Sequence, residues 1–184
     1  YNLIKWAKLF LKNKTFTSFA GSNSSCALLF PMEKLFESYV AQSLRKVLPE
    51  GWTMFCQEKK HYLFEKLNDD KYRRFSLIPD IVLRFYNDKE TRTVILDTKW
   101  KRLNNKKECN YGISQSDMYQ MYAYSKKYKT SEIWVLYPAN EQMRSETKIN
   151  FDSGDGTVVS LFFVDLEKAQ SLSDLVKQAN LKYL

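Results

Sequence analysis

Hydrophobic and polar positions follow two different periods along the chain, and the longer period predicts helices. From Met32 to about Leu48, apolar side chains recur at spacings of three and four residues, the pattern of a helix with one buried face. Pro31 precedes this helix, and Pro49 and Gly51 end it. The sequence predicts further helices over 2–12, from about Ser114 to Tyr128, and over 172–183.

Short runs rich in β-branched and aromatic residues predict the strands. These runs are 53–57, 62–66, 75–85, 92–100, 133–137 and 158–164. Turn residues at 87–90 join the third run to the fourth and indicate a hairpin. The order of helices and strands favours an α/β fold of the mixed α+β kind, with one central mixed β-sheet flanked by helices. We expect a single domain over 1–184.

Composition supports a folded domain without a membrane span. The chain has 184 residues, of which 44% are hydrophobic, with only five Gly and four Pro, so a disordered chain is excluded. Apolar runs such as 27–30 are far too short to cross a bilayer. No signal peptide is evident, so we expect a cytoplasmic protein. Because the chain begins at Tyr1 inside an expected helix, we expect it to be the C-terminal part of a longer chain.

Charge and cysteine content limit the classes of ligand and metal site that the chain is expected to have. The net charge is +8, and residues 1–110 carry 21 basic and 12 acidic side chains. Such a surplus suits a polyanion such as nucleic acid, although a solvated basic surface explains it equally well. Three cysteines without C-x-x-C spacing and a single histidine do not support a zinc or iron–sulfur site. We expect the cysteines to be reduced and mostly buried.

Three polar residues interrupt the two strands of the expected hairpin. Asp80 lies within the apolar run 75–85, and Asp97 and Lys99 follow three apolar residues. Side chains at i and i+2 share a strand face, so Asp97 and Lys99 should point the same way, with Cα atoms roughly 7 Å apart. Buried carboxylates need a compensating cation. An internal ion pair with Lys99 would supply one, and a Mg²⁺ ion bound by carboxylate and carbonyl oxygens would supply another. The two strands together favour the metal site.

Pro79-Asp80, followed after sixteen residues by Asp97-Thr98-Lys99, resembles the PD-(D/E)xK nuclease signature. Gln120 and Tyr124, on the helix that follows, are similar to the Q-x-x-x-Y motif of RecB-like nucleases, although a tyrosine-rich core face would also explain that helix. The superfamily often adds an acid from a preceding helix. Glu37 matches this position better than Glu33, whose place in the first helical turn suits the helix dipole.

A longer resemblance is to the McrC family, the nuclease subunits of modification-dependent McrBC restriction systems. The similar segments occur in the family's order within about 2–138, and they are 30–40, 78–82, 95–101 and 116–124. This set is not expected in a RecB or Cas4-type exonuclease. The chain lacks the family's N-terminal region, which would be expected to help dock the partner.

The resemblance implies a Mg²⁺-dependent endonuclease with a PD-(D/E)xK core, with Mn²⁺ able to replace Mg²⁺. Asp80, Asp97, the Thr98 carbonyl and Glu37 would hold one or two ions, and Lys99 would orient or help deprotonate the attacking water. Further residues would contact double-stranded DNA or support the site: Gln120, Tyr124, Lys101, Arg102, Lys106 and Lys107. Recognition of 5-methylcytosine and GTP hydrolysis would belong to an AAA+ GTPase subunit of the McrB type, within a hetero-oligomer.

Two other functions stay open at this point. One is a RecB-like DNA exonuclease acting on DNA ends. The other is a catalytically inactive nuclease fold that binds DNA or a partner, although such copies usually lose one of the residues Asp80, Asp97 and Lys99. The four basic residues after the second strand would equally suit a solvated loop.

Overall fold

The computed structural model describes residues 31–66, 73–87, 91–168 and 170–181. Residues Glu33–Leu184 form one compact unit, distinct from a second unit at Tyr1–Met32. The helix predicted over 2–12 lies outside the described residues, and a single domain over 1–184 stays a prediction. Among the described helices, none combines the length and the apolar character that a bilayer crossing requires.

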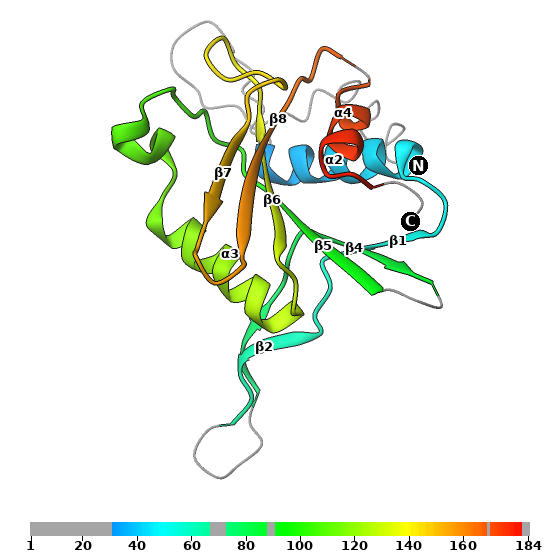
Figure 1. Ribbon diagram of the computed structural model, residues 1–184. Helices are drawn as coiled ribbons and strands as arrows, with labels where there is room; N and C mark the ends of the chain where they lie inside the picture. The colour runs from blue at the N-terminus through cyan, green and yellow to red at the C-terminus, as the bar shows by residue number, and fades with distance from the viewer. Residues whose placement is uncertain (1–30, 67–72, 88–90, 169, 182–184) are drawn as a thin grey trace, which may run out of the picture. The chain divides into compact units, whose positions relative to one another are not determined.

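Six strands form the main sheet, in the order β1-β4-β5-β6-β8-β7 (Figure 1). Their bounds are Trp52–Cys56 for β1, Ile81–Tyr86 for β4, Thr91–Thr98 for β5, Glu132–Pro138 for β6, Ile149–Asp152 for β7 and Val158–Val164 for β8. β5, β6 and β8 run parallel, and the other neighbours pair antiparallel. The predicted α/β class with a central mixed sheet is confirmed.

Helices cover both faces of this sheet. α2 (Met32–Val47) and α4 (Ser171–Gln178) pack on one face, where Leu44 and Leu96 are fully buried. α3 (Gln115–Tyr128), which connects the parallel strands β5 and β6, packs on the other face, where Met121 and Ile95 are fully buried. Successive strand residues point to opposite faces, so β5 contributes even-numbered residues to the first core and odd-numbered residues to the second.

The prediction of one strand over 75–85 is wrong. The segment forms two strands, β3 (Arg74–Leu77) and β4, with Ile78, Pro79 and Asp80 between them. Proline has no N–H to donate to a strand ladder, so the pairing ends there. β3 pairs instead with β2 (His61–Phe64) in a separate two-stranded sheet. The expectation of a single sheet is therefore corrected.

Smaller differences concern segments with weak sequence signals. Two elements of the structure were not predicted. One is β7, and the other is a 3₁₀ helix, η1 (Lys107–Gly112), which lies in the predicted basic loop. α3 begins as predicted, because the Ser114 hydroxyl accepts a hydrogen bond from the backbone N–H of Asp117 at 3.1 Å. α4 ends earlier than predicted, before Asn180 with its positive φ of 49°.

The expectation of mostly buried cysteines is wrong for the two described ones. Cys56 and Cys109 are both free and exposed. Cys56 is the last residue of β1, at the edge of the sheet, and Cys109 lies in η1. The exposure of both side chains is set by where the fold places them, and the small apolar character of cysteine does not determine that exposure. Cys26 lies outside the described residues.

Candidate active site

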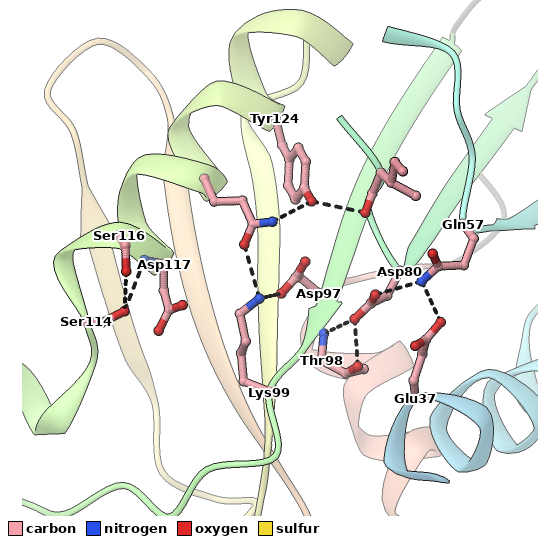
Figure 2. Close-up of polar contacts among 12 residues, drawn as sticks. Glu37, Gln57, Asp80, Asp97, Thr98, Lys99, Ser114, Ser116, Asp117 and Tyr124 are labelled. Atoms are coloured by element: carbon pink, nitrogen blue, oxygen red, sulfur yellow. Dashed lines mark hydrogen bonds and ion pairs between the residues drawn. The ribbon is translucent and has the colours of Figure 1, made fainter. Parts of the chain in front are cut away.

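A cavity of about 380 Å³ opens at the carboxyl end of β5. Residues from α2, the start of β4, the end of β5 and α3 meet there (Figure 2). α2 and α3 cover opposite faces of the sheet, and side chains from both helices line this cavity. The lining consists of Glu33, Lys34, Glu37, Ile78, Asp80, Asp97, Thr98, Lys99, Trp100, Lys101, Asp117 and Gln120.

Asp80 lies at the start of β4, where the ladder with β5 ends. Its Oδ2 accepts hydrogen bonds from the backbone N–H of Thr98 at 2.8 Å and from the Thr98 hydroxyl at 2.6 Å. The register that pairs Ile81 with Leu96 would continue to Pro79 beside Thr98, and Pro79 cannot donate. The Asp80 carboxylate thus takes the place of a ladder partner for the Thr98 N–H.

Asp97 is the buried carboxylate of the cavity. It is only 2% exposed, and its Oδ2 lies 2.6 Å from Lys99 Nζ. Among the described residues, this ion pair with Lys99 is the contact found for the buried oxygen. Burial, joined by the negative charge of Asp80, raises the pKa of Asp97 to about 6, against the opposing effect of Lys99.

Lys99 lies just beyond β5, but its N–H still bonds to Leu136 O of β6 at 2.9 Å. The chain direction of the strand therefore continues, and Asp97 and Lys99 point to the same side, as predicted. The Asp97–Lys99 ion pair, considered as an alternative to a metal site, is present.

A chain of hydrogen bonds links Lys99 to α3. Lys99 Nζ donates to Gln120 Oε1 at 3.1 Å, and Gln120 Nε2 donates to the Tyr124 hydroxyl at 2.9 Å. That hydroxyl donates to Ile78 O at 3.1 Å, and burial raises its pKa, which favours the donor form. Tyr124 is 1% exposed within a core that also contains Met121 and Tyr128. α3 thus has the tyrosine-rich core face, with Gln120 at its margin in the cavity.

Gln57 connects Glu37 of α2 with Asp80, and it was not predicted from the sequence as a site residue. Its Nε2 donates to Glu37 Oε1 at 2.6 Å and to Asp80 Oδ1 at 3.0 Å (Figure 2). Gln57 follows β1 with a positive φ of 52°, and its N–H bonds to Asp80 O at 3.0 Å. The available signal was a pair of polar residues, Gln57 and Glu58, directly after the strand.

Both acids of α2 line the cavity. Glu37 Oε2 also pairs with Lys34 Nζ at 2.9 Å, and Glu33 lies one turn earlier. Of the two, Glu37 is connected to Asp80 through the Gln57 amide, which donates to both carboxylates. The choice of Glu37 over Glu33 as a metal ligand stays a prediction.

The four basic residues proposed as DNA contacts do not lie together. Lys101 lines the cavity. Arg102 is turned to a different pocket, and its side chain, 70% exposed, lies 3.8 Å from Glu141. Lys106 precedes η1 and Lys107 begins it, both exposed. Only Lys101 therefore adjoins the carboxylates.

A comparison with protein families matches residues 1–138 to the model described as McrBC 5-methylcytosine restriction system component. The match covers three quarters of the chain and includes every residue of the cavity. The chain belongs to this family. A comparison with curated proteins found no match. Membership in the McrBC family gives the chain a role in a restriction system and supports the McrC-type interpretation.

The McrBC-family site has the donor chemistry that a hard divalent ion prefers. Asp80, Asp97 and Glu37 offer carboxylate oxygens, Thr98 also lines the cavity, and Asp97 Oδ2 is buried in its ion pair with Lys99. Within the described ranges, however, no three His, Cys, Asp or Glu side chains are arranged to hold a metal ion. Lys99 and Gln57 contact these carboxylates instead. Ion binding would therefore require these contacts to change.

Proposed function

We propose that this chain is the nuclease subunit of a modification-dependent restriction system and hydrolyses DNA phosphodiesters with Mg²⁺. The observation that carries the proposal is that Asp80, Asp97 and Lys99 line one cavity, although 17 positions separate the two aspartates in the chain. Carboxylates beside an amine, in an open polar cavity at a sheet edge, suit the hydrolysis of a charged phosphodiester. Family membership supports the same activity class.

In this proposal each cavity residue has a definite task. Asp80, Asp97, the Thr98 carbonyl and Glu37 would hold Mg²⁺, which supplies an activated water and neutralises phosphate charge. Lys99 would orient the attacking water and offset the negative charge that grows on the phosphate. Gln120 and Tyr124 would hold the Lys99 ammonium in place through the hydrogen bonds described above.

We expect activity to depend on an AAA+ GTPase subunit of the McrB type that recognises 5-methylcytosine. The test is cleavage of closed-circular methylated plasmid by the full-length protein with this partner, GTP and Mg²⁺; Mn²⁺ should replace Mg²⁺. Asp97→Ala and Lys99→Ala should abolish cleavage, and unmethylated plasmid should stay intact. Full activity of either variant would contradict the proposal. Cleavage of linear DNA only would indicate a RecB-like exonuclease instead.

One observation favours a second function, an inactive nuclease fold that binds DNA or its partner. Protein side chains already contact the three carboxylates, and the described residues contain no ready-made three-ligand metal group. Titration calorimetry with Mn²⁺ separates the two functions. An active nuclease should bind Mn²⁺ and lose that binding in Asp80→Ala, whereas an inactive fold should show no binding that depends on Asp80.

A further inference from the structure

The two-stranded sheet of β2 and β3, with the residues that flank it, forms a ribbon (residues 58–66 and 73–77) with exposed aromatic side chains. Phe64 is 55% exposed and Phe75 is 71% exposed. Their rings pack edge to face, with centroids 6.0 Å apart. Exposing two phenylalanine side chains to water costs hydrophobic free energy. Two exposed phenylalanines that pack together therefore indicate a surface that contacts another molecule.

The charge of the ribbon favours a polyanion as its partner. The ribbon carries five basic residues, Lys59, Lys60, Lys66, Arg73 and Arg74, and all five are exposed. Its two acids are both paired: Glu58 with Arg84 at 2.6 Å, and Glu65 with Arg73 at 3.4 Å. Basic side chains that contact phosphates, together with apolar side chains such as Phe that enter a groove, are typical of surfaces that bind a DNA duplex.

The ribbon is inserted between two residues of the site. Gln57 precedes it and Asp80 follows it, three residues after Leu77. Three residues span at most about 10 Å, which is about three nucleotide steps along a DNA strand. The end of the ribbon at Leu77 therefore lies within about 10 Å of Asp80, so a duplex with a phosphate in the cavity would pass close to this end.

Contacts with the body of the protein fix the root of the ribbon. Glu58 forms two hydrogen bonds with Arg84 of β4, at 2.7 and 2.6 Å. Tyr128 of α3 donates to Glu58 O at 3.3 Å, and its ring lies 4.4 Å from the ring of His61. Figure 1 shows β2 beside the end of α3. The same helix accepts a hydrogen bond from Lys99 through Gln120, so the ribbon and the cavity both contact α3.

We propose that this ribbon binds the DNA duplex next to the cleavage cavity. Phe64 and Phe75 contact bases or sugars in a groove, and Lys59 and Lys60 contact phosphates. The inference rests on the proposed function for its substrate, and it assigns to the ribbon a binding surface that is separate from the catalytic residues.

The test measures the anisotropy of a labelled duplex bound to the full-length protein, with Ca²⁺ in place of Mg²⁺, at several salt concentrations. Phe64→Ser/Phe75→Ser should weaken binding by about tenfold without changing the salt dependence. Lys59→Gln/Lys60→Gln should lower the slope of log K against log salt by about 2. The matched controls Leu166→Ser and Lys177→Gln, exposed at other sites, should change neither quantity.

The outcomes separate this inference from the nuclease proposal. Unchanged DNA binding in both ribbon variants, or no DNA binding by the wild-type protein with its GTPase partner present, overturns the ribbon surface. Loss of assembly with the partner, at unchanged DNA affinity, makes the ribbon a protein-docking surface and also overturns it. If wild-type protein binds DNA through the ribbon but cleaves nothing, the nuclease proposal fails and the ribbon stands. The melting temperatures of the variants check that each is folded.

Discussion

At the scale of single residues, Asp97 has a proposed role in catalysis, and burial of its charged carboxylate lowers the stability of the fold. Its carboxylate is buried, and the ion pair with Lys99 at 2.6 Å balances its charge. Asp97→Asn removes that buried charge. We expect cleavage to fall by about a hundredfold or more, while the melting temperature measured without divalent ions does not fall.

Asp174→Asn, on the exposed side of α4, is the matched control and should change neither cleavage nor melting temperature. If Asp97→Asn instead unfolds the protein, the carboxylate has a structural role and the loss of activity carries no chemical meaning. Lys99→Met then provides an independent test, because it removes the amine and leaves the strand intact.

The Gln57 amide donates to both Glu37 and Asp80, so we expect it to compete with a divalent cation for these carboxylates. Gln57→Ala leaves these carboxylates without that donor and should lower stability in the absence of ions by about 1 kcal/mol. Mn²⁺ should then raise the melting temperature more in the variant than in the wild type. Gln142→Ala, at an exposed position, serves as the control. An equal or smaller Mn²⁺ shift in Gln57→Ala would contradict this competition.

At the scale of elements, α3 connects the cavity to the core through Tyr124. Tyr124→Phe removes the donor to Ile78 O and the acceptor for Gln120. We expect a loss of about 1 kcal/mol in the free energy of unfolding and about a tenfold lower cleavage rate, since Lys99 loses part of its support. Tyr119→Phe on the exposed face of the same helix should have no effect on either. Equal effects of the two substitutions would exclude a special role for Tyr124.

The root of the ribbon should respond to pH through Glu58. Hydrogen bonds from Arg84, opposed by burial, hold the pKa of Glu58 below its ordinary value of 4.5. A carboxyl group whose pKa is lower in the folded state than in the unfolded state stabilises the fold at pH values above its unfolded-state pKa. This stabilisation is lost as the pH falls through the folded-state pKa. Glu58→Gln should therefore cost about 1 kcal/mol at pH 7, and denaturant titrations should show the difference vanishing in acid. A constant difference at every pH would refute it.

The elements with strong periodicity could be predicted from the sequence, and those set by tertiary pairing could not. Apolar spacing and the flanking prolines predict the end of α2 at about Leu48, one residue beyond its observed end at Val47. The run 75–85 looks continuous because Ile78 and Val82 are apolar on both sides of Pro79. Pro79 cannot donate to a strand ladder, and the two parts pair in separate sheets, β3 with β2 and β4 with β1 and β5. β7 has four residues and is defined by its pairing with β8.

At the scale of the whole molecule, the candidate site depends on topology more than on motif. The sequence places Asp97 and Lys99 on one side of a strand, and that local geometry is confirmed. The meeting of Glu37 with Asp80 requires α2 to lie on the face opposite α3, and it is completed by Gln57 from the end of β1. No spacing along the chain encodes that bridge, which explains why Gln57 was missed while its two partners were predicted.

We expect the fold to be independent of metal, because two hydrophobic cores supply its packing and the cavity carboxylates have protein partners. Asp80 is bonded to Thr98 and Gln57, and Asp97 is paired with Lys99. Removing divalent ions with EDTA should therefore abolish cleavage and leave the circular dichroism spectrum unchanged. Returned Mg²⁺ should restore cleavage without a refolding phase. Unfolding in EDTA would show instead that the ion is structural, and cleavage that persists in EDTA would contradict metal-dependent hydrolysis at this cavity.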